Sequence, residues 1–494
     1  MAHVISTGTS APSVGASRAN WVLAAPVAVS LLLAARVVTQ SFWVDEAATA
    51  SAISRSPAQL WEMLANVDAT MSVYYMFMHF WSVVFGTSEL ALRTPSVLAM
   101  AAAAGLTGLL GRRIRGLPVG MTAATVLAIS PIAVKYSVEA RPYALATFFV
   151  VAAGFVAHHG AKRPATTSAM AGWAILAAVA VGFHFLAILA VAVQVLWLSE
   201  RRTRWLWALL PLAVSLTVAA GIVSQPSYQG WIPQLGVVDL PRAFLAMAGA
   251  AGVILFGIGA VVLLVRRQRL PETRTDITVI VGWALAPAVV LAIASLVYKP
   301  MFLTRYLIMS MPAIALAVAL VAVAAYKSLA HYDWLRLATG IVAVGCLLAT
   351  AASYAVLPPD EGEDPRAAAT YISANAEPGD AIVYSPSWGE IAPAWYFAQE
   401  GQSTPRDLTT QPGSTAVANS SLWPAQITVD QATAELTSVN RLWVVQAAGG
   451  GAGVWEPIPN VGGPVAAYVE ANWSQVEHRE FGRIRVSLWQ RTAV

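Results

Sequence analysis

Charged residues are scarce in this chain: they make up 11% of its 494 residues, whereas hydrophobic residues make up 57%. An average soluble domain is roughly 25% charged. The mean hydropathy of the chain is +0.62. This composition excludes an ordinary soluble protein and indicates a polytopic membrane protein.

Cysteine and lysine are also rare. An intramolecular disulfide is excluded because the chain has one cysteine, Cys346. This residue lies inside a hydrophobic run, which gives no support for a cysteine metal site. There are four lysines against 26 arginines. The position of each lysine is therefore informative.

Hydrophobic runs of membrane-spanning length dominate the chain as far as Leu357. The first run is not followed by a cleavage pattern and soluble sequence, so we interpret it as a retained helix and not as a signal peptide. About eleven spanning helices are predicted, at residues 21–40, 92–111, 117–134, 143–159, 168–183, 185–199, 205–224, 242–265, 277–298, 305–325 and 336–357.

Three parts of the chain are expected. They are a cytoplasmic segment (1–20), a transmembrane domain (21–357) whose first outer loop covers 41–91, and a small extracytoplasmic α/β domain (358–494). Hydrophobic periodicity in the last part predicts helices at 365–375 and 464–472 and strands at 381–384, 442–446 and 483–490.

Basic residues fall in alternate loops, which the positive-inside rule assigns to the cytoplasm. The N-terminus is then cytoplasmic, and the protein is expected to lie in the plasma (inner) membrane with residues 358–494 outside. This last part has a net charge of −8, whereas residues 1–357 have +12. The basic pI of 9.2 thus reflects anchoring at the inner face and not nucleic-acid binding. The basic positions are Arg112–Arg115, Lys162–Arg163, Arg201–Arg204, Arg266–Arg269 and Lys327.

This topology depends on the first outer loop. Its stretches 57–65 and 72–85 are amphipathic, and the first begins with Ser56 and Pro57, which favour a helix start. Counting 72–85 as a full span would place the arginine clusters outside. We therefore interpret it as a helix on the outer membrane surface.

An acidic pair, Asp45 and Glu46, directly follows the first span. Carboxylates are costly where a helix leaves a bilayer, so the pair is a functional-site hypothesis. The alternative is an ordinary solvated loop. Other polar residues converge on the same predicted face, as an outward-facing active site requires.

Two of the four lysines, Lys135 and Lys299, lie on this outer face, where the positive-inside rule disfavours them. One interpretation is a pair of phosphate-binding cations, with Arg141 and Arg305 as bidentate partners. The alternative is snorkelling to lipid headgroups. His184 could contact substrate, but a lone histidine at a helix turn is more often structural.

The order of these motifs resembles that of the GT-C superfamily of membrane glycosyltransferases. The matching features are the Asp-Glu pair, Asp68 before the tyrosines 74–75, and the segments 85–96 and 136–143. Within the superfamily the chain is most similar to bacterial members of the protein mannosyltransferase-like group. The resemblance covers roughly residues 21–325 and is weaker in the tail.

The resemblance implies an inverting glycosyltransferase that moves a sugar, mannose in preference to arabinose, from a polyprenyl-phosphate donor to an outer-face acceptor. On the family pattern, Asp45 is the catalytic base or acceptor-binding acid and Glu46 supports it. Substrate-binding candidates are Asp68, Tyr74, Tyr136, Glu139, Arg141 and His184. Candidates for binding the lipid phosphate are Lys135, Lys299, Arg305 and Tyr306.

One segment departs from the family pattern. Many relatives have a His-Pro-Pro-Leu-like segment where this chain has residues 69–73, so donor or acceptor binding is expected to differ. A divalent metal bridging Asp45 and Glu46 is supported only weakly, because two adjacent acids lack a clear third ligand, and no other cofactor is implied. Expected partners are the lipid-linked donor, a glycan, lipid or protein acceptor, and membrane lipid, but no nucleic acid.

A transporter or flippase of a lipid-linked sugar is the alternative function. Such a protein should show paired half-repeats and charges near the middle of the membrane. No repeat is evident in this sequence, and its charges cluster at helix ends.

Overall fold

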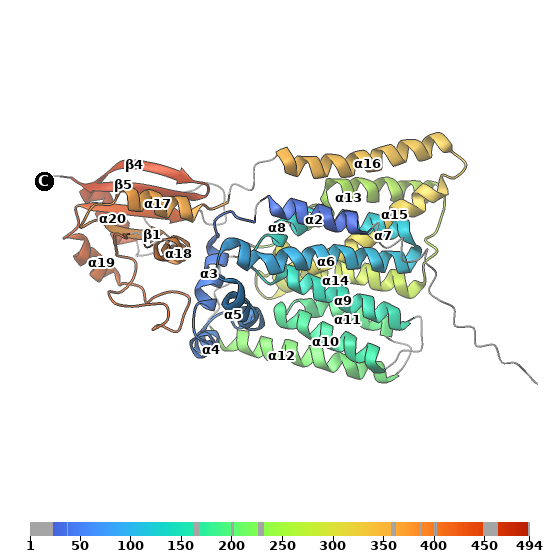
Figure 1. Cartoon of the computed structure of the whole chain (residues 1–494), viewed down its shortest axis with the longest axis horizontal. Helices are drawn as coiled ribbons and strands as arrows, with labels where there is room; N and C mark the ends of the chain where they lie inside the picture. Colours follow the sequence, from blue (N-terminus) through green and yellow to red (C-terminus); the bar gives the residue numbers. More distant parts are fainter. Residues whose placement is uncertain are drawn as a thin grey trace, which may run out of the picture.

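The computed structural model describes residues 23–492, except residue 37 and the segments 162–166, 199–201, 226–231, 357–361, 386, 400, 402 and 448–462. A bundle of long helices forms one part of the molecule, and a small α/β domain lies at one end of it (Figure 1).

Every predicted span coincides with a helix of the bundle. The helices are α2 Ala24–Ala35, α6 Glu89–Arg115, α7 Leu117–Ala128, α8 Pro131–Ser137, α9 Tyr143–Ala161, α10 Thr167–Phe183, α11 Ala187–Gln194, α12 Leu209–Ser224, α13 Asp239–Val265, α14 Arg274–Val297, α15 Met311–Ser328 and α16 Asp333–Val356.

Six helices of the described chain are long and apolar enough to cross a membrane, and the pair α7 and α8 makes up to seven. This pair is bent by 61°. Pro131 begins α8, and proline disfavours helical backbone at the residue before it. Four further apolar helices are shorter than a full span. The prediction of a multi-pass membrane protein is confirmed, whereas the number of about eleven spans stays a prediction.

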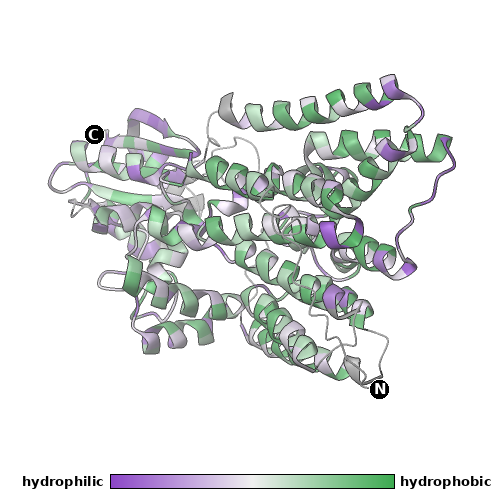
Figure 2. Cartoon of the chain, turned by 45° about the vertical axis from the view of Figure 1, so that its right-hand side comes forward, coloured by the Kyte–Doolittle hydropathy of each residue, from purple (hydrophilic) through white to green (hydrophobic). Residues whose placement is uncertain are grey.

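The bundle is apolar along its length and polar at its ends (Figure 2). Two of the predicted basic loops lie at the end remote from the α/β domain (Figure 1). There Nη1 of Arg115 lies 2.9 Å from Oε1 of Glu272, and Arg266 donates a hydrogen bond to the Tyr332 hydroxyl at 3.1 Å. The membrane face at which each end lies stays a prediction.

The segment predicted to be the first outer loop folds into helices at the domain end of the bundle: α3 Val44–Ile53, α4 Pro57–Asn66 and α5 Ser72–Phe85. Both predicted amphipathic stretches are confirmed as helices. The Ser56 side chain caps α4 by accepting from the Gln59 N–H at 3.3 Å. Helix α3 was not predicted, because its sequence is short and has weak periodicity. The acidic pair therefore lies in the first turn of a helix and not in a loop.

The α/β domain has a five-stranded sheet in the order β2-β1-β3-β5-β4, with β2, β1 and β3 parallel and the other pairs antiparallel. The predicted helices and strands are confirmed. Strand β4 was missed because it is an edge strand whose residues are mostly exposed and polar, without hydrophobic alternation. The elements are α17 Pro365–Asn375, β1 Ala381–Ser385, α18 Ile391–Gln399, β2 Arg406–Asp407, α19 Val429–Leu436, β3 Arg441–Ala447, α20 Gly463–Asn472, β4 Trp473–Phe481 and β5 Ile484–Arg491.

The α/β domain and the bundle share one hydrophobic core. Phe42, just before α3, is fully buried. Its ring centroid lies 6.4 Å from that of Trp395 and 6.5 Å from that of Tyr396, both on α18. Burial of large aromatic side chains is a major source of binding free energy between packed elements. The domain is therefore docked directly against the segment that leads into the acidic pair.

Candidate active site

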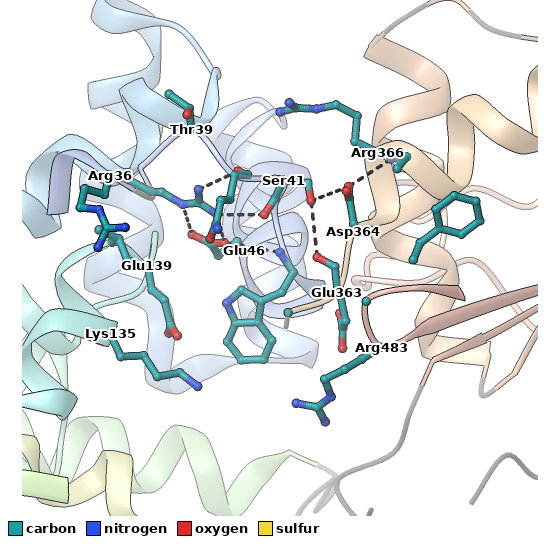
Figure 3. Close-up of a pocket in the computed structure, with 18 of the residues that line it drawn as sticks. Arg36, Thr39, Ser41, Glu46, Lys135, Glu139, Glu363, Asp364, Arg366 and Arg483 are labelled. Carbon is teal, nitrogen blue, oxygen red and sulfur yellow. Dashed lines mark hydrogen bonds and ion pairs between the residues drawn. The ribbon is translucent and has the colours of Figure 1, made fainter. Parts of the chain in front are cut away.

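A cavity of about 1220 Å³ lies between the bundle and the α/β domain. Figure 3 shows Lys135 and Glu139 of the bundle on one wall, with Glu363, Arg366 and Arg483 of the domain on the other. Seven Lys or Arg residues line the cavity against four Asp or Glu residues. This excess of positive charge suits an anionic ligand.

Asp45 in α3 is held by two guanidinium groups. Its Oδ2 lies 3.5 Å from Nη1 of Arg305 and 3.8 Å from Nη2 of Arg141. Arg141 also donates to the main-chain oxygen of Asp45 at 3.2 Å. The Asp45 side chain keeps 29% of its surface exposed but does not line the cavity, whereas Arg305 does. Arg305 therefore connects this carboxylate to the cation-rich cavity.

Glu46 is fully buried and its oxygens are engaged. Arg93 donates to it at 2.5 and 2.8 Å, and the Ala140 N–H donates at 2.7 Å. Arg93 further donates to the main-chain oxygens of three residues before α3. Glu46 thus joins α3 to α6 and to the loop that carries Ala140.

Asp68 and Tyr74 lie near Arg141 but do not line the cavity. Asp68 has a left-handed backbone (φ 56°) and accepts a hydrogen bond from Tyr75 at 2.9 Å. Burial raises the pKa of Asp68, and the charge of Arg141 opposes this rise. The hydroxyl of Tyr74 is buried without a hydrogen-bond partner among the described residues.

Glu139 lines the cavity and is 6% exposed. Its Oε2 has no hydrogen-bond partner in the described chain. Burial, and after it the charge of Glu46, raise the pKa of this carboxyl to about 8 against the opposing charge of Lys135. Glu139 is therefore mainly protonated at neutral pH and can donate a hydrogen bond to a ligand.

Glu139→Gln is expected to remove a pH dependence of stability. Between its ordinary pKa of 4.5 and about 8, the folded protein holds a proton that the unfolded chain has lost. The contribution of Glu139 to the free energy of unfolding should thus fall as the pH rises through this range, by up to about 1.4 kcal/mol per pH unit, and the variant lacks this contribution. Thermal unfolding of both proteins in nanodiscs at a series of pH values measures this. Parallel profiles would contradict it.

The remaining candidates are divided by the structure. Tyr136 lines the cavity. The His184 ring packs against the Tyr306 ring, and their centroids lie 5.6 Å apart. Neither residue lines the cavity. Burial and the nearby charges of Arg141 and Arg305 lower the pKa of His184 to about 3. It is therefore a neutral imidazole and not a phosphate-binding cation.

Two of the predicted cations, Lys299 and Arg141, do not line the cavity. Arg141 contacts Asp45 instead, and the Nζ of Lys299 lies 5.5 Å from the ring centroid of Tyr298. Lys135 and Arg305, by contrast, both line the cavity. The predicted cations therefore differ in position, which allows a direct comparison by mutation.

Several cavity residues were not identified from the sequence. Arg93 could have been found, because an isolated arginine near the start of an apolar run needs an internal partner. Glu363, Arg366 and Arg483 belong to the α/β domain and carry no local signal. No group of three or more His, Cys, Asp or Glu side chains among the described residues could hold a metal ion, and Asp45 and Glu46 are engaged by different arginines.

No protein-family model matches the chain, and no curated protein matches its sequence. Its structure is similar to that of ArnT from Cupriavidus metallidurans, with a TM-score of 0.58, 13% identity, and 96% of this chain and 98% of that chain covered. ArnT from the same organism bound to undecaprenyl phosphate gives a TM-score of 0.56 and 12% identity, with 97% of this chain and 98% of that chain covered. Archaeal oligosaccharyltransferase AglB from Archaeoglobus fulgidus, in complex with an inhibitory peptide and a dolichol-phosphate, gives a TM-score of 0.51 and 12% identity, with 88% of this chain and 70% of that chain covered.

Identities this low establish the fold and leave the activity to be argued from the site. The chain has the fold of the GT-C membrane glycosyltransferases, and the resemblance inferred from its sequence motifs is confirmed at this level.

Proposed function

We propose that this protein is an inverting glycosyltransferase that moves a sugar from a polyprenyl-phosphate donor to an acceptor on the outer face of the plasma membrane. Mannose is the favoured sugar, and arabinose is the second. The observation that carries the proposal is Arg305, which joins the Asp45 carboxylate to a cation-rich cavity. By analogy, structures of ArnT and AglB hold undecaprenyl phosphate and a dolichol-phosphate.

The proposed reaction is a single displacement. The acceptor hydroxyl oxygen forms a bond to the anomeric carbon while the bond from that carbon to the donor phosphate oxygen breaks. The electron pair leaves with the lipid phosphate, which Arg305 and Lys135 stabilise. Asp45 takes the hydroxyl proton. A phosphate leaving group needs little acid assistance, so one base suffices.

The ion pair between Asp45 and Arg305 implies that the donor binds before Asp45 accepts a proton. A donor phosphate in the cavity competes with Asp45 for the same guanidinium group, 3.5 Å from the carboxylate. Donor binding therefore frees a carboxylate oxygen to accept a proton. Charge-assisted bonds from arginine to phosphate are strong enough to compete in this way.

The experiment that tests the function is sugar transfer by the purified full chain in nanodiscs. Polyprenyl-phosphate mannose and polyprenyl-phosphate arabinose are offered separately, each with an envelope extract as the source of acceptor. Labelled sugar in a product from either donor supports the proposal and identifies the sugar. No transfer from either donor, with a folded protein, contradicts it.

Lys135→Ala is expected to raise the KM for the lipid-linked donor about tenfold or more, with a smaller effect on kcat. Loss of a charge-assisted hydrogen bond to phosphate accounts for a change of this size, about 1.5–3 kcal/mol. The matched variant Lys299→Ala removes a lysine from the same face but outside the cavity. Donor titrations of both variants measure the difference, and equal KM values would contradict the assignment of Lys135.

A further inference from the structure

The backbone N–H groups at the start of α3 are bonded to side chains of the α/β domain. The Val44 N–H, at the first position of the helix, donates to Oε2 of Glu363 at 3.2 Å. The Phe42 N–H donates to the hydroxyl of Tyr396 at 2.7 Å. The first N–H groups of a helix have no partner within it, so external acceptors fix where the helix begins. Asp45 is the next residue of this first turn.

The segment that carries Glu363 is itself held in place. Ser41 donates to Asp364 at 2.9 Å, and Asp364 caps α17 by accepting from the Ala367 N–H at 3.1 Å. Residue Glu363 also forms an isolated β-bridge with Gly482, in the turn between β4 and β5. Figure 3 shows Ser41, Glu363 and Asp364 together at the junction of the two parts.

Gly482 is required for this bridge. Its φ is +59°, a left-handed backbone that favours glycine. A Cβ atom at this position would overlap the main-chain oxygen of Gly362. Any larger residue must therefore displace the chain beside Glu363. The backbone bridge between Gly482 and Glu363 thus connects the β4–β5 turn, through the Glu363 side chain, to the helix that carries the proposed base.

From these contacts we infer that Glu363 is a positioning residue for Asp45, through which the α/β domain fixes the helix turn that carries the proposed base. The inference rests on the proposed function for its catalytic consequence. Its structural half is independent of that function. A displacement of a catalytic group by about 1 Å can lower the reaction rate about 10²-fold. Loss of the hydrogen bond between Val44 and Glu363 should therefore affect the reaction rate as well as the stability of the protein.

Amide hydrogen exchange tests the structural half on the full chain in nanodiscs. In Glu363→Ala we expect faster exchange of the segment containing residues 44–46 than in the wild type. Gly482→Ala should give the same result through displacement of residues 362–364. Glu363→Gln keeps an oxygen acceptor and should stay close to the wild type. Glu435→Ala, which breaks an exposed ion pair with Arg406 in the same domain, is the matched control. Unchanged exchange in both Glu363→Ala and Gly482→Ala overturns the inference.

Kinetics test the catalytic half. Glu363→Ala should lower kcat about 10–100-fold with the donor KM within about twofold, because the substrate-binding cations remain. The same substitution in an Asp45→Asn background should cause little further loss, since a positioning residue acts only through the group that it positions. Additive losses, or a loss confined to KM, overturn the inference. If the wild type transfers no sugar, the proposed function fails, and hydrogen exchange alone decides whether the domain holds α3.

Discussion

Asp45→Asn is expected to lower sugar transfer by about 10²–10⁴-fold, the range that general-base assistance typically provides. The amide has the size of the carboxylate but cannot accept the acceptor proton. It also weakens the contacts of 3.5 and 3.8 Å with Arg305 and Arg141. We expect kcat to fall much more than KM, because donor binding depends mainly on the cations of the cavity.

The matched control for Asp45→Asn is Asp430→Asn. Asp430 also lies in the first turn of a helix, α19, and it is exposed in the α/β domain far along the chain. This control should leave transfer within about twofold of the wild type. Thermal unfolding of both variants shows whether each is folded. A folded Asp45→Asn protein with unchanged kcat would exclude Asp45 as the base.

Arg93→Ala is expected to lower the free energy of unfolding by about 3–5 kcal/mol, the cost of leaving a buried charge without its partner. Arg93 is 4% exposed and Glu46 is 0% exposed. The substitution also removes donors from three main-chain oxygens that precede α3. Loss of this group therefore weakens the contact between α3 and α6.

The control for Arg93→Ala is Arg406→Ala, which breaks an ion pair whose side chains are 50% and 35% exposed. Pairs of this kind contribute about 0–1 kcal/mol. Thermal or denaturant unfolding in detergent measures both variants. Arg93→Lys keeps the charge but not the bidentate hydrogen bonding to Glu46. It should lower the free energy of unfolding by an intermediate amount, and it replaces the alanine variant if that variant does not accumulate. Equal stability of Arg93→Ala and Arg406→Ala would contradict a stabilising role for the buried pair.

The acidic pair illustrates how far sequence reasoning reaches. Its position after the first span marked both acids as functional candidates, because a charge is costly there. The two residues are adjacent and chemically similar, so no local signal could separate their environments. In the structure one carboxylate is partly exposed between two arginines and the other is completely enclosed by Arg93 and a main-chain N–H. Side-chain partners that are distant in the chain make this difference.

The α/β domain shows the same limit. Its buried strands and two of its helices follow from hydrophobic periodicity, whereas the exposed edge strand β4 does not. Nothing in the periodicity of residues 362–366 indicates that Glu363 caps α3. The residues joined at this junction lie far apart in the sequence, and Ser41 and Asp364 are 323 positions apart.

The sequence by itself determined the membrane class, the positions of the apolar helices, the existence of a polar terminal domain and the acids and cations worth testing. Each of these depends on a local free energy: the cost of placing a charge, or the gain from burying an apolar run. Only the tertiary structure decided that Arg305 and Lys135 line one cavity while Lys299 does not, and that the terminal domain supplies the second wall. These outcomes depend on how the domain docks through Phe42 and α18, a packing that no single segment specifies.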